Sequence, residues 1–296
     1  MNKQRPVFFS RIVLAISFVI ISVNTLSANH FSDTGKKLLI AGLDKKEAPA
    51  TIIIAPNVVF PAILTGNEEQ SVDYIEKFAG DRKDYIIRTF NKGKKYFPKV
   101  TAILNKYGLP NELKVLLALE SAFKANAVSK AGAVGYWQFM DEVAKEYGLK
   151  ISAQLSANEK KKLLKKDKKK ADAQFKEMAK KKDDRKNFNK STYAAARYLK
   201  DRAKNLNNDI LLMVASYNCG IGNVWGAMAS CGKNDPTFWD IKDRLPAETR
   251  AYVMNFITLN VIFENFENFC NNNLNFKPIK VNLGTSGLQS TEQSLD

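Results

Sequence analysis

The spacing of hydrophobic residues along the first half of the chain predicts helices. Between residues 71 and 106, apolar side chains recur every three or four positions, which is the period of an amphipathic helix, and Gly108 with Pro110 marks a stop. After Pro110, a densely apolar run predicts a buried helix that leads directly into Glu120. We therefore expect two or three helices, followed by a buried helix with a carboxylate at its end.

Helices are also predicted in the second half of the chain, after a loop of small residues. The loop at 124–135 contains Gly132 and Gly135, and glycines let a backbone approach a ligand closely. An aromatic and amide cluster at 136–139 then enters a short helix that ends near Gly148. Helical spacing returns in three segments, namely 191–206, 210–217 and the long stretch that begins at Pro246.

The two ends of the chain lack this helical periodicity. Residues 1–28 have the pattern of a secretory signal, because basic residues precede an apolar stretch at 12–23 and small residues end at Ala28, where we expect cleavage. An uncleaved anchor is the alternative, but a membrane-spanning helix needs about 20 apolar residues. Residues 29–69 predict an irregular leader, and the Ser, Thr and Gln residues of 271–296 predict a C-terminal tail.

Basic charge is concentrated in one part of the chain. The sequence carries 46 Lys and Arg against 30 Asp and Glu, a net charge of +16, and half of this excess lies between residues 159 and 186. We expect a Lys-rich helical insertion over 156–188, with a thin apolar stripe of Leu164, Ala171, Phe175 and Met178. This insertion is either a solvated helix or a surface that attracts an anionic partner. A nucleic acid is not expected, because the basic excess is confined to one segment.

The residue types present restrict the chemistry that the chain can perform. The only histidine, His30, lies in the leader, which excludes Ser-His-Asp triads, Cys-His dyads and histidine-ligated zinc, and three cysteines cannot complete a four-thiolate zinc site. We therefore expect chemistry run by carboxylates, tyrosines, amides and hydroxyls, and we assign no cofactor and no metal ligand. An oxygen-ligated metal ion is the alternative that these residue types leave open. Cys219 and Cys231 are close enough in sequence for a disulfide, but three reduced thiols, including Cys270, are an equally good interpretation.

Glu120 is the strongest candidate for a catalytic group. It follows a run of largely apolar residues, and desolvation raises the pKa of a carboxyl group toward the range that suits a general acid. Taken alone, Glu120 is better explained as a surface glutamate at a helix end. The residues that gather near helix breaks and glycine turns favour a functional role, and they are Ser121, Ser129, Gln138, Tyr217 and Asn218. Tyr136, Trp137 and Phe139 suit either sugar stacking or the core, and we expect at least one of them in the core.

Five short motifs identify a family when they are taken together in order. They are residues 120–121, Ser129, 132–139, 217–220 and 246–253. In order and spacing they resemble the soluble lytic transglycosylase (SLT) domain family, with the closest likeness to its membrane-bound murein transglycosylase D type. The resemblance covers residues 70–270, which we expect to form one catalytic domain interrupted by the Lys-rich insertion.

This resemblance implies a mainly α, lysozyme-like fold and a cleft for the glycan strands of peptidoglycan. Glu120 would be the only catalytic carboxylate, first protonating the oxygen between N-acetylmuramic acid and N-acetylglucosamine, then removing the proton of the muramoyl 6-hydroxyl as a 1,6-anhydro ring closes. An intramolecular hydroxyl dispenses with the second carboxylate of an ordinary glycosidase. The expected substrate-binding residues are Ser121, Ser129, Gln138, Tyr217, Asn218, Glu248 and Tyr252, among which Tyr217 would orient Glu120 and Glu248 would contact the muramoyl side.

The sequence departs from the family pattern at two places, and it leaves two rival functions open. Ser216 stands where the family usually has alanine, and the Lys-rich insertion is an addition that suits an anionic wall or membrane surface. The rivals are a water-using muramidase on the same fold and a non-catalytic cell-wall-binding protein. We expect a monomer that is exported to the periplasm or cell envelope of a Gram-negative-type bacterium.

Overall fold

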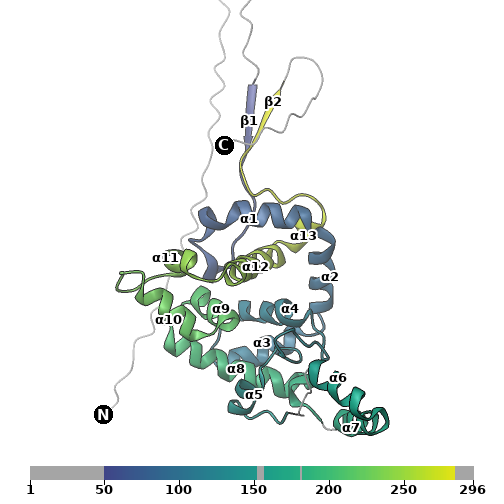
Figure 1. Ribbon diagram of the computed structural model, residues 1–296. Coiled ribbons are helices and arrows are strands. Elements are labelled where there is room, and N and C mark those ends of the chain that lie inside the picture. The colour runs from purple at the N-terminus through teal and green to yellow at the C-terminus, as the bar shows by residue number, and fades with distance from the viewer. Residues whose placement is uncertain (1–49, 152–156, 181, 284–296) are drawn as a thin grey trace, which may run out of the picture. The chain divides into compact units, whose positions relative to one another are not determined.

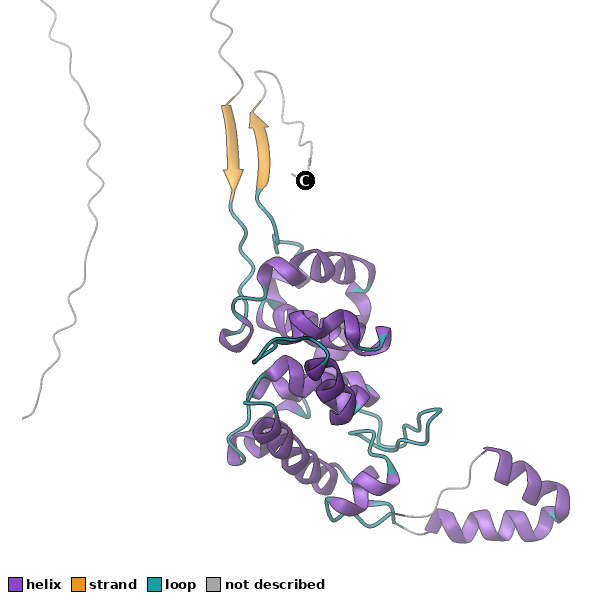
Figure 2. Ribbon diagram, turned by 60° about the vertical axis from the view of Figure 1, so that its left-hand side comes forward, coloured by secondary structure: helices purple, strands orange, loops and turns teal. Residues whose placement is uncertain are grey.

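The computed structural model describes residues 50–151, 157–180 and 182–283. This part of the chain is built mainly from helices, as expected (Figure 1; Figure 2). The α-helices are α1 (Glu68–Asp81), α2 (Lys83–Gly93), α3 (Phe97–Lys106), α4 (Leu116–Ser121), α5 (Asp141–Glu146), α6 (Ala157–Lys166), α7 (Lys168–Lys180), α8 (Phe188–Asn205), α9 (Ile210–Cys219), α10 (Ile221–Ala229), α11 (Phe238–Ile241), α12 (Ala247–Glu264) and α13 (Phe266–Cys270). Short 3-10 helices are η1 (Ala62–Leu64), η2 (Asn111–Val115), η3 (Asp184–Lys186) and η4 (Lys242–Arg244).

The helices predicted from hydrophobic spacing are present with small differences. The segment 71–106 forms three helices, α1, α2 and α3. The apolar run after Pro110 begins as the 3-10 helix η2 and continues as α4, so the buried rod before Glu120 changes helix type along its length. Gly108 has a φ of +63°, a left-handed conformation that glycine adopts without strain and that ends α3.

The core is centred on α12 and α9. Seven successive residues of α9, from Ile210 to Ser216, are buried, and α12 buries ten residues. A helix that is apolar on all sides needs neighbours all round, and α12 is packed by α1, α9, α4 and η2. The chain thereby places the end of α4, which carries Glu120, against the first turns of α12.

A two-stranded ribbon joins residues that are far apart in sequence. Strand β1 (Ala50–Ile54) pairs antiparallel with β2 (Ile279–Leu283), with Ala50 opposite Leu283 and Ile54 opposite Ile279 (Figure 2). The ribbon falls within the expected irregular leader and the expected tail, and the sequence did not predict it. Both strands contain β-branched residues, but no local turn connects them. The expected signal segment 1–28 and the ends of the leader and tail lie outside the described residues.

The Lys-rich insertion forms two helices, where the sequence had suggested a single basic helix. Helices α6 and α7 meet at Asp167. The side chain of Asp167 accepts a hydrogen bond from the backbone N–H of Lys170 at 3.1 Å, so it caps the start of α7 and interrupts α6. Of the expected apolar stripe, Ala171 is buried, whereas Leu164 is 41% exposed.

The described residues contain neither a membrane-spanning helix nor a disulfide bond. No helix in 50–151, 157–180 or 182–283 is long and apolar enough to cross a membrane. The three cysteines, all within this part of the chain, have free thiols in the structure.

Candidate active site

Glu120 stands at an abrupt helix end. The three residues Leu116, Leu117 and Ala118 of α4 are buried, and the helix stops one residue after Glu120. Ala122 and Phe123 then adopt left-handed conformations, with φ of 46° and 63°. Such conformations are costly for residues with a side chain, so the packing around this turn must hold them. The turn leaves the Glu120 side chain partly exposed at the end of a buried helix.

Burial gives Glu120 an unusual protonation equilibrium. Desolvation raises the pKa of its carboxyl group from 4.5 to about 7, the charge of Glu248 adds to the rise, and a hydrogen bond from Tyr252 opposes it. The expectation that burial raises the pKa of Glu120 is therefore confirmed. A carboxyl group with a pKa near 7 has both protonation states populated at neutral pH, so the same group can donate a proton and take one back.

Tyr252 is the phenol that contacts Glu120. Its hydroxyl, on the second turn of α12, donates a hydrogen bond of 2.5 Å to Oε1 of Glu120. Burial and the Glu120 charge raise the pKa of Tyr252 well above its ordinary value, so the hydroxyl remains a donor at neutral pH. We had expected Tyr252 only among the substrate-binding residues.

The hydroxyl of Tyr217 bonds to the loop after α4 and not to Glu120 itself. Its hydroxyl donates to the backbone oxygen of Trp137 at 2.8 Å, which ties the end of α9 to the loop that carries the aromatic cluster. Its ring packs edge-on against Tyr198, with centroids 5.4 Å apart. The charge of Glu120 contributes to the raised pKa of Tyr217, so the two groups are neighbours. The hydrogen bond that holds the Glu120 carboxyl group comes from Tyr252, whereas we expected it from Tyr217.

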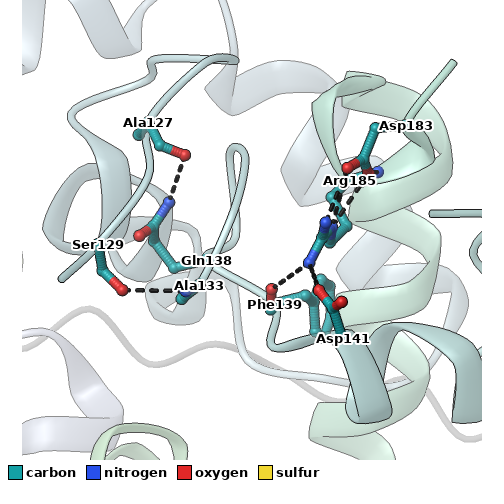
Figure 3. Close-up of polar contacts among 8 residues, drawn as sticks. All are labelled: Ala127, Ser129, Ala133, Gln138, Phe139, Asp141, Asp183 and Arg185. Carbon is teal, nitrogen blue, oxygen red and sulfur yellow. Dashed lines mark hydrogen bonds and ion pairs between the residues drawn. The ribbon is translucent and has the colours of Figure 1, made fainter. Parts of the chain in front are cut away.

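Ser121, Ser129 and Gln138 hold the loop between α4 and α5 in shape. Ser121 is buried, and its hydroxyl donates to the backbone oxygen of Tyr136 at 2.8 Å. The hydroxyl of Ser129 accepts a hydrogen bond from the N–H of Ala133 at 3.0 Å (Figure 3). The side-chain amide of Gln138 donates to the oxygens of Gly135 and Ala127, at 2.8 and 3.2 Å.

These bonds give the three residues structural partners. Ser129 remains exposed and Gln138 partly exposed, which leaves both of them accessible to a ligand. Trp137 is fully buried and its indole N–H donates to Thr192 at 3.0 Å, so the expectation of a core residue in the aromatic cluster is confirmed.

Asn218 and Glu248 lie on the two helices that flank Glu120. The side-chain oxygen of Asn218, near the end of α9, accepts a hydrogen bond of 2.7 Å from the hydroxyl of Thr249. Glu248 is exposed in the first turn of α12, where acidic side chains are favourable. Because the charge of Glu248 contributes to the raised pKa of Glu120, the two carboxyl groups are close enough for their charges to interact.

Arg185 is a residue of the site region that the sequence did not single out. Its side chain is 0% exposed. The guanidinium binds the Asp183 carboxylate through Nε at 3.0 Å and Nη2 at 2.8 Å, while Nη1 donates to Asp141 and, at 3.3 Å, to the backbone oxygen of Phe139 (Figure 3). These contacts, which we call the Arg185 clamp, join the C-terminal end of the Lys-rich insertion to the residues that follow Gln138.

Gly135 allows this clamp to form. It has a φ of +87°, and a Cβ atom there would lie 2.1 Å from the backbone oxygen of Arg185. A residue with a side chain would therefore collide with the clamp. The sequence signal for Arg185 was hidden, because a long run of lysines is typical of a solvated surface.

Replacing Tyr252 tests how the pKa of Glu120 is controlled. A hydrogen bond to the ionised carboxylate favours ionisation, so Tyr252→Phe is expected to raise the pKa of Glu120 above 7. The measurement is a carbon-13 NMR titration of the glutamate carboxyl groups, with the Glu120 signal assigned by its absence in Glu120→Gln. Tyr217→Phe is the matched control, because its hydroxyl bonds to Trp137. A shift in the control alone would show that the donor has been misassigned.

Taken together, the helices and the site define a mainly α domain with a glutamic acid, Glu120, that is partly exposed and hydrogen-bonded to a phenol. Residues 100–237 match the family model of the transglycosylase SLT domain. This match agrees with the resemblance found in the sequence motifs, and it makes residues 100–237 similar to the SLT domain. Glu248 and Tyr252 lie just beyond the matched residues.

Comparisons with individual proteins agree with the match to the SLT domain. The chain is 28% identical over 190 residues to membrane-bound lytic murein transglycosylase D in two strains of Escherichia coli, which covers 63% of this chain and 35% of each relative. The chain thus spans about a third of the length of the curated relatives it matches.

Two solved structures were found at lower similarity. An inactive mutant of lytic transglycosylase Slt from Pseudomonas aeruginosa is 20% identical with a TM-score of 0.39, over 59% of this chain and 24% of that one. The 70 kDa soluble lytic transglycosylase from Escherichia coli is 18% identical with a TM-score of 0.39, over 72% and 38%.

The described residues were also compared with the usual ligand sets of metal ions. Within the described part of the chain, no three His, Cys, Asp or Glu side chains gather in a way that could hold one.

Proposed function

We propose that this chain is a peptidoglycan lytic transglycosylase that cleaves the β-1,4 bond between N-acetylmuramic acid and N-acetylglucosamine. The observation that carries the proposal is the pKa of Glu120, raised to about 7 in a site that also holds the Tyr252 hydroxyl. The SLT domain match over residues 100–237 and the murein transglycosylase relatives support the substrate class. The activity is proposed for a chain shorter than those relatives.

The reaction needs only one proton-carrying group. Protonated Glu120 donates its proton to the glycosidic oxygen as the bond from that oxygen to C1 of the muramoyl residue breaks. The 6-hydroxyl of the same residue then forms a bond to C1 and returns its proton to Glu120. No water is consumed, and one product ends in a 1,6-anhydro ring. Because the attacking hydroxyl is part of the substrate, its effective concentration is high without any help from a second carboxylate.

Tyr252 contributes by keeping Glu120 ready for both steps. Its hydrogen bond fixes the carboxyl group and partly opposes the effect of burial, so the pKa is not driven far above 7. A higher pKa would leave a poor acid for the first step, and a lower one a poor base for the second. We assign sugar contacts to the exposed Ser129 and the partly exposed Gln138, and contacts on the muramoyl side to Glu248.

A water-using muramidase is the second candidate, and the nearby Glu248 is the observation that favours it. In such an enzyme a second carboxylate activates water or attacks the sugar. Digestion of purified cell wall in oxygen-18 water separates the two reactions. We expect products with anhydromuramoyl ends, one water lighter than reducing ends and free of oxygen-18. Labelled reducing ends would establish hydrolysis instead, and an absence of any soluble product would favour a wall-binding protein.

We further propose that the protein acts in the cell envelope of a Gram-negative-type bacterium after export. The secretory pattern of residues 1–28 supports export, and the relatives named membrane-bound murein transglycosylase D support a location at the wall.

A further inference from the structure

The lysines of α6 and α7 form a concentrated positive surface. Seven lysines lie between residues 161 and 170, and all of them are exposed: Lys161, Lys162, Lys165, Lys166, Lys168, Lys169 and Lys170. None of them forms an ion pair with a described residue of the chain. With seven lysines and one acidic residue, Asp167, residues 161–170 carry an excess of positive charge that can attract an anionic partner. We call this region, residues 161–170, the lysine surface.

An apolar side chain accompanies the lysines. Leu164 is 41% exposed between Lys162 and Lys165, whereas Ala171, at the start of α7, is only 2% exposed. The small side chain of Ala171 is thus covered by the protein, whereas the large side chain of Leu164 is exposed to water. A single exposed leucine is common on protein surfaces, but among lysines it has a use, because a surface that enters a lipid headgroup region gains from an apolar side chain.

The kind of positive charge also indicates the partner. Residues 161–170 contain lysine and no arginine. Arginine binds fixed carboxylates through two parallel hydrogen bonds, whereas lysine acts as a point charge on a flexible stem. Lysines therefore suit headgroups that move laterally and gather beneath a charged surface. Their long apolar stems also let the ammonium groups remain at the phosphates while Leu164 reaches deeper.

We propose that the lysine surface binds the anionic phosphate headgroups of a lipid bilayer. The binding is electrostatic, with Leu164 inserted at the interface, and it does not depend on the proposed reaction of Glu120. Long-range attraction falls with salt, since the Debye length is about 8 Å at physiological ionic strength. The surface would hold the protein at a membrane while the Arg185 clamp keeps the end of the insertion fixed to the SLT domain.

Vesicle sedimentation with the full chain tests this proposal. Vesicles of phosphatidylcholine alone are compared with vesicles that also contain phosphatidylglycerol, at low and at high salt. The neutral vesicles record whatever the apolar residues 12–23 contribute by themselves. We expect tighter binding to the anionic vesicles. Replacing Lys165, Lys166, Lys168 and Lys169 by glutamine should weaken that binding by about 100-fold, because each lysine near an anionic membrane contributes several-fold.

The matched control neutralises four exposed lysines elsewhere, Lys77, Lys99, Lys145 and Lys280. It lowers the net charge by the same amount and is expected to change vesicle binding by no more than about three-fold. Circular dichroism of both variants should match that of the unmodified chain. A loss of the same size in the control would attribute binding to overall charge and overturn the proposal.

Leu164→Gln distinguishes a bilayer from an anionic polymer. Removing the apolar side chain should weaken binding to anionic vesicles by about five-fold, because Leu164 no longer enters the interface. Pelleting with purified cell wall should be unaffected. If the lysine substitutions reduce pelleting with cell wall but leave vesicle binding intact, or if anionic and neutral vesicles bind equally, the partner is not a membrane.

Discussion

Glu120→Gln is expected to reduce the release of anhydromuramoyl products from cell wall by at least about 1,000-fold. The amide has the size and shape of the acid but can neither protonate the glycosidic oxygen nor accept the proton of the 6-hydroxyl. General acid-base catalysis typically contributes 10²- to 10⁴-fold per step, and Glu120 serves in both steps. The measurement is the initial rate of product release, quantified by chromatography and mass spectrometry. Glu142→Gln on α5, which is exposed, is the matched control and should retain full activity.

The inactive variant should still fold and still bind the wall. The pKa of Glu120 is about 7 in the folded protein against an ordinary value of 4.5, so the folded state binds this proton more tightly than the unfolded state. Stability of the unmodified chain therefore falls as the pH rises from 4.5 through 7, where burial disfavours the charge. Glutamine carries no charge, so Glu120→Gln should be the more stable protein at pH 8, as measured by urea unfolding. Activity retained in a folded variant would refute the assignment of Glu120.

The position and the protonation of Glu120 were predictable because both depend on local sequence. An apolar run that ends in a glutamate predicts a carboxyl group at the end of a buried helix, and burial by itself raises the pKa. The helices before and after it were predictable for the same reason, since hydrophobic spacing is a local signal. The break at Asp167 also had a local signal, because aspartate is a preferred N-cap residue.

The partner of Glu120 was not predictable, because it depends on packing between distant segments. Tyr252 follows Glu120 by 132 residues. Tyr217 and Tyr252 both lie on helices that pack near the end of α4, and hydrophobic periodicity does not tell which hydroxyl reaches the carboxylate. The pairing of β1 with β2 is a similar case, since residues 50 and 283 share no local turn. Tertiary arrangement decides both contacts.

Replacing Arg185 is expected to produce the largest loss of stability among these variants. Arg185 is 0% exposed and Asp183 is 1% exposed, so Arg185→Met leaves a carboxylate buried without its guanidinium partner. Removing one member of a buried ion pair typically costs about 3 to 5 kcal/mol. We expect a decrease of this size in the free energy of unfolding, measured by urea denaturation. Lys182→Met, an exposed neighbour in the same basic run, should change it by less than about 0.5 kcal/mol.

Two further substitutions separate the ion pair from simple packing. Arg185→Lys keeps the positive charge but cannot reach Asp183, Asp141 and the Phe139 oxygen together, because lysine has one compact ammonium group. It should therefore lose most of the stability that Arg185→Met loses. Adding Asp183→Asn to Arg185→Met removes the buried negative charge that has lost the guanidinium, and it should restore a substantial part of the loss. If the double variant is no more stable than Arg185→Met, the cost comes from lost packing of the side chain.

The clamp also connects stability to the site. Phe139 and Asp141, which the clamp contacts, come soon after Gln138 in the sequence. The side chain of Gln138 in turn holds the loop at 124–135 through the backbone oxygens of Gly135 and Ala127. A chain that loses the clamp but remains folded should bind cell wall more weakly, because the loop carrying Ser129 and Gln138 is no longer held in one conformation. Binding to cell wall is to be measured with Arg185→Lys at low temperature. Wall binding equal to that of the unmodified chain would confine the clamp to a purely stabilising role.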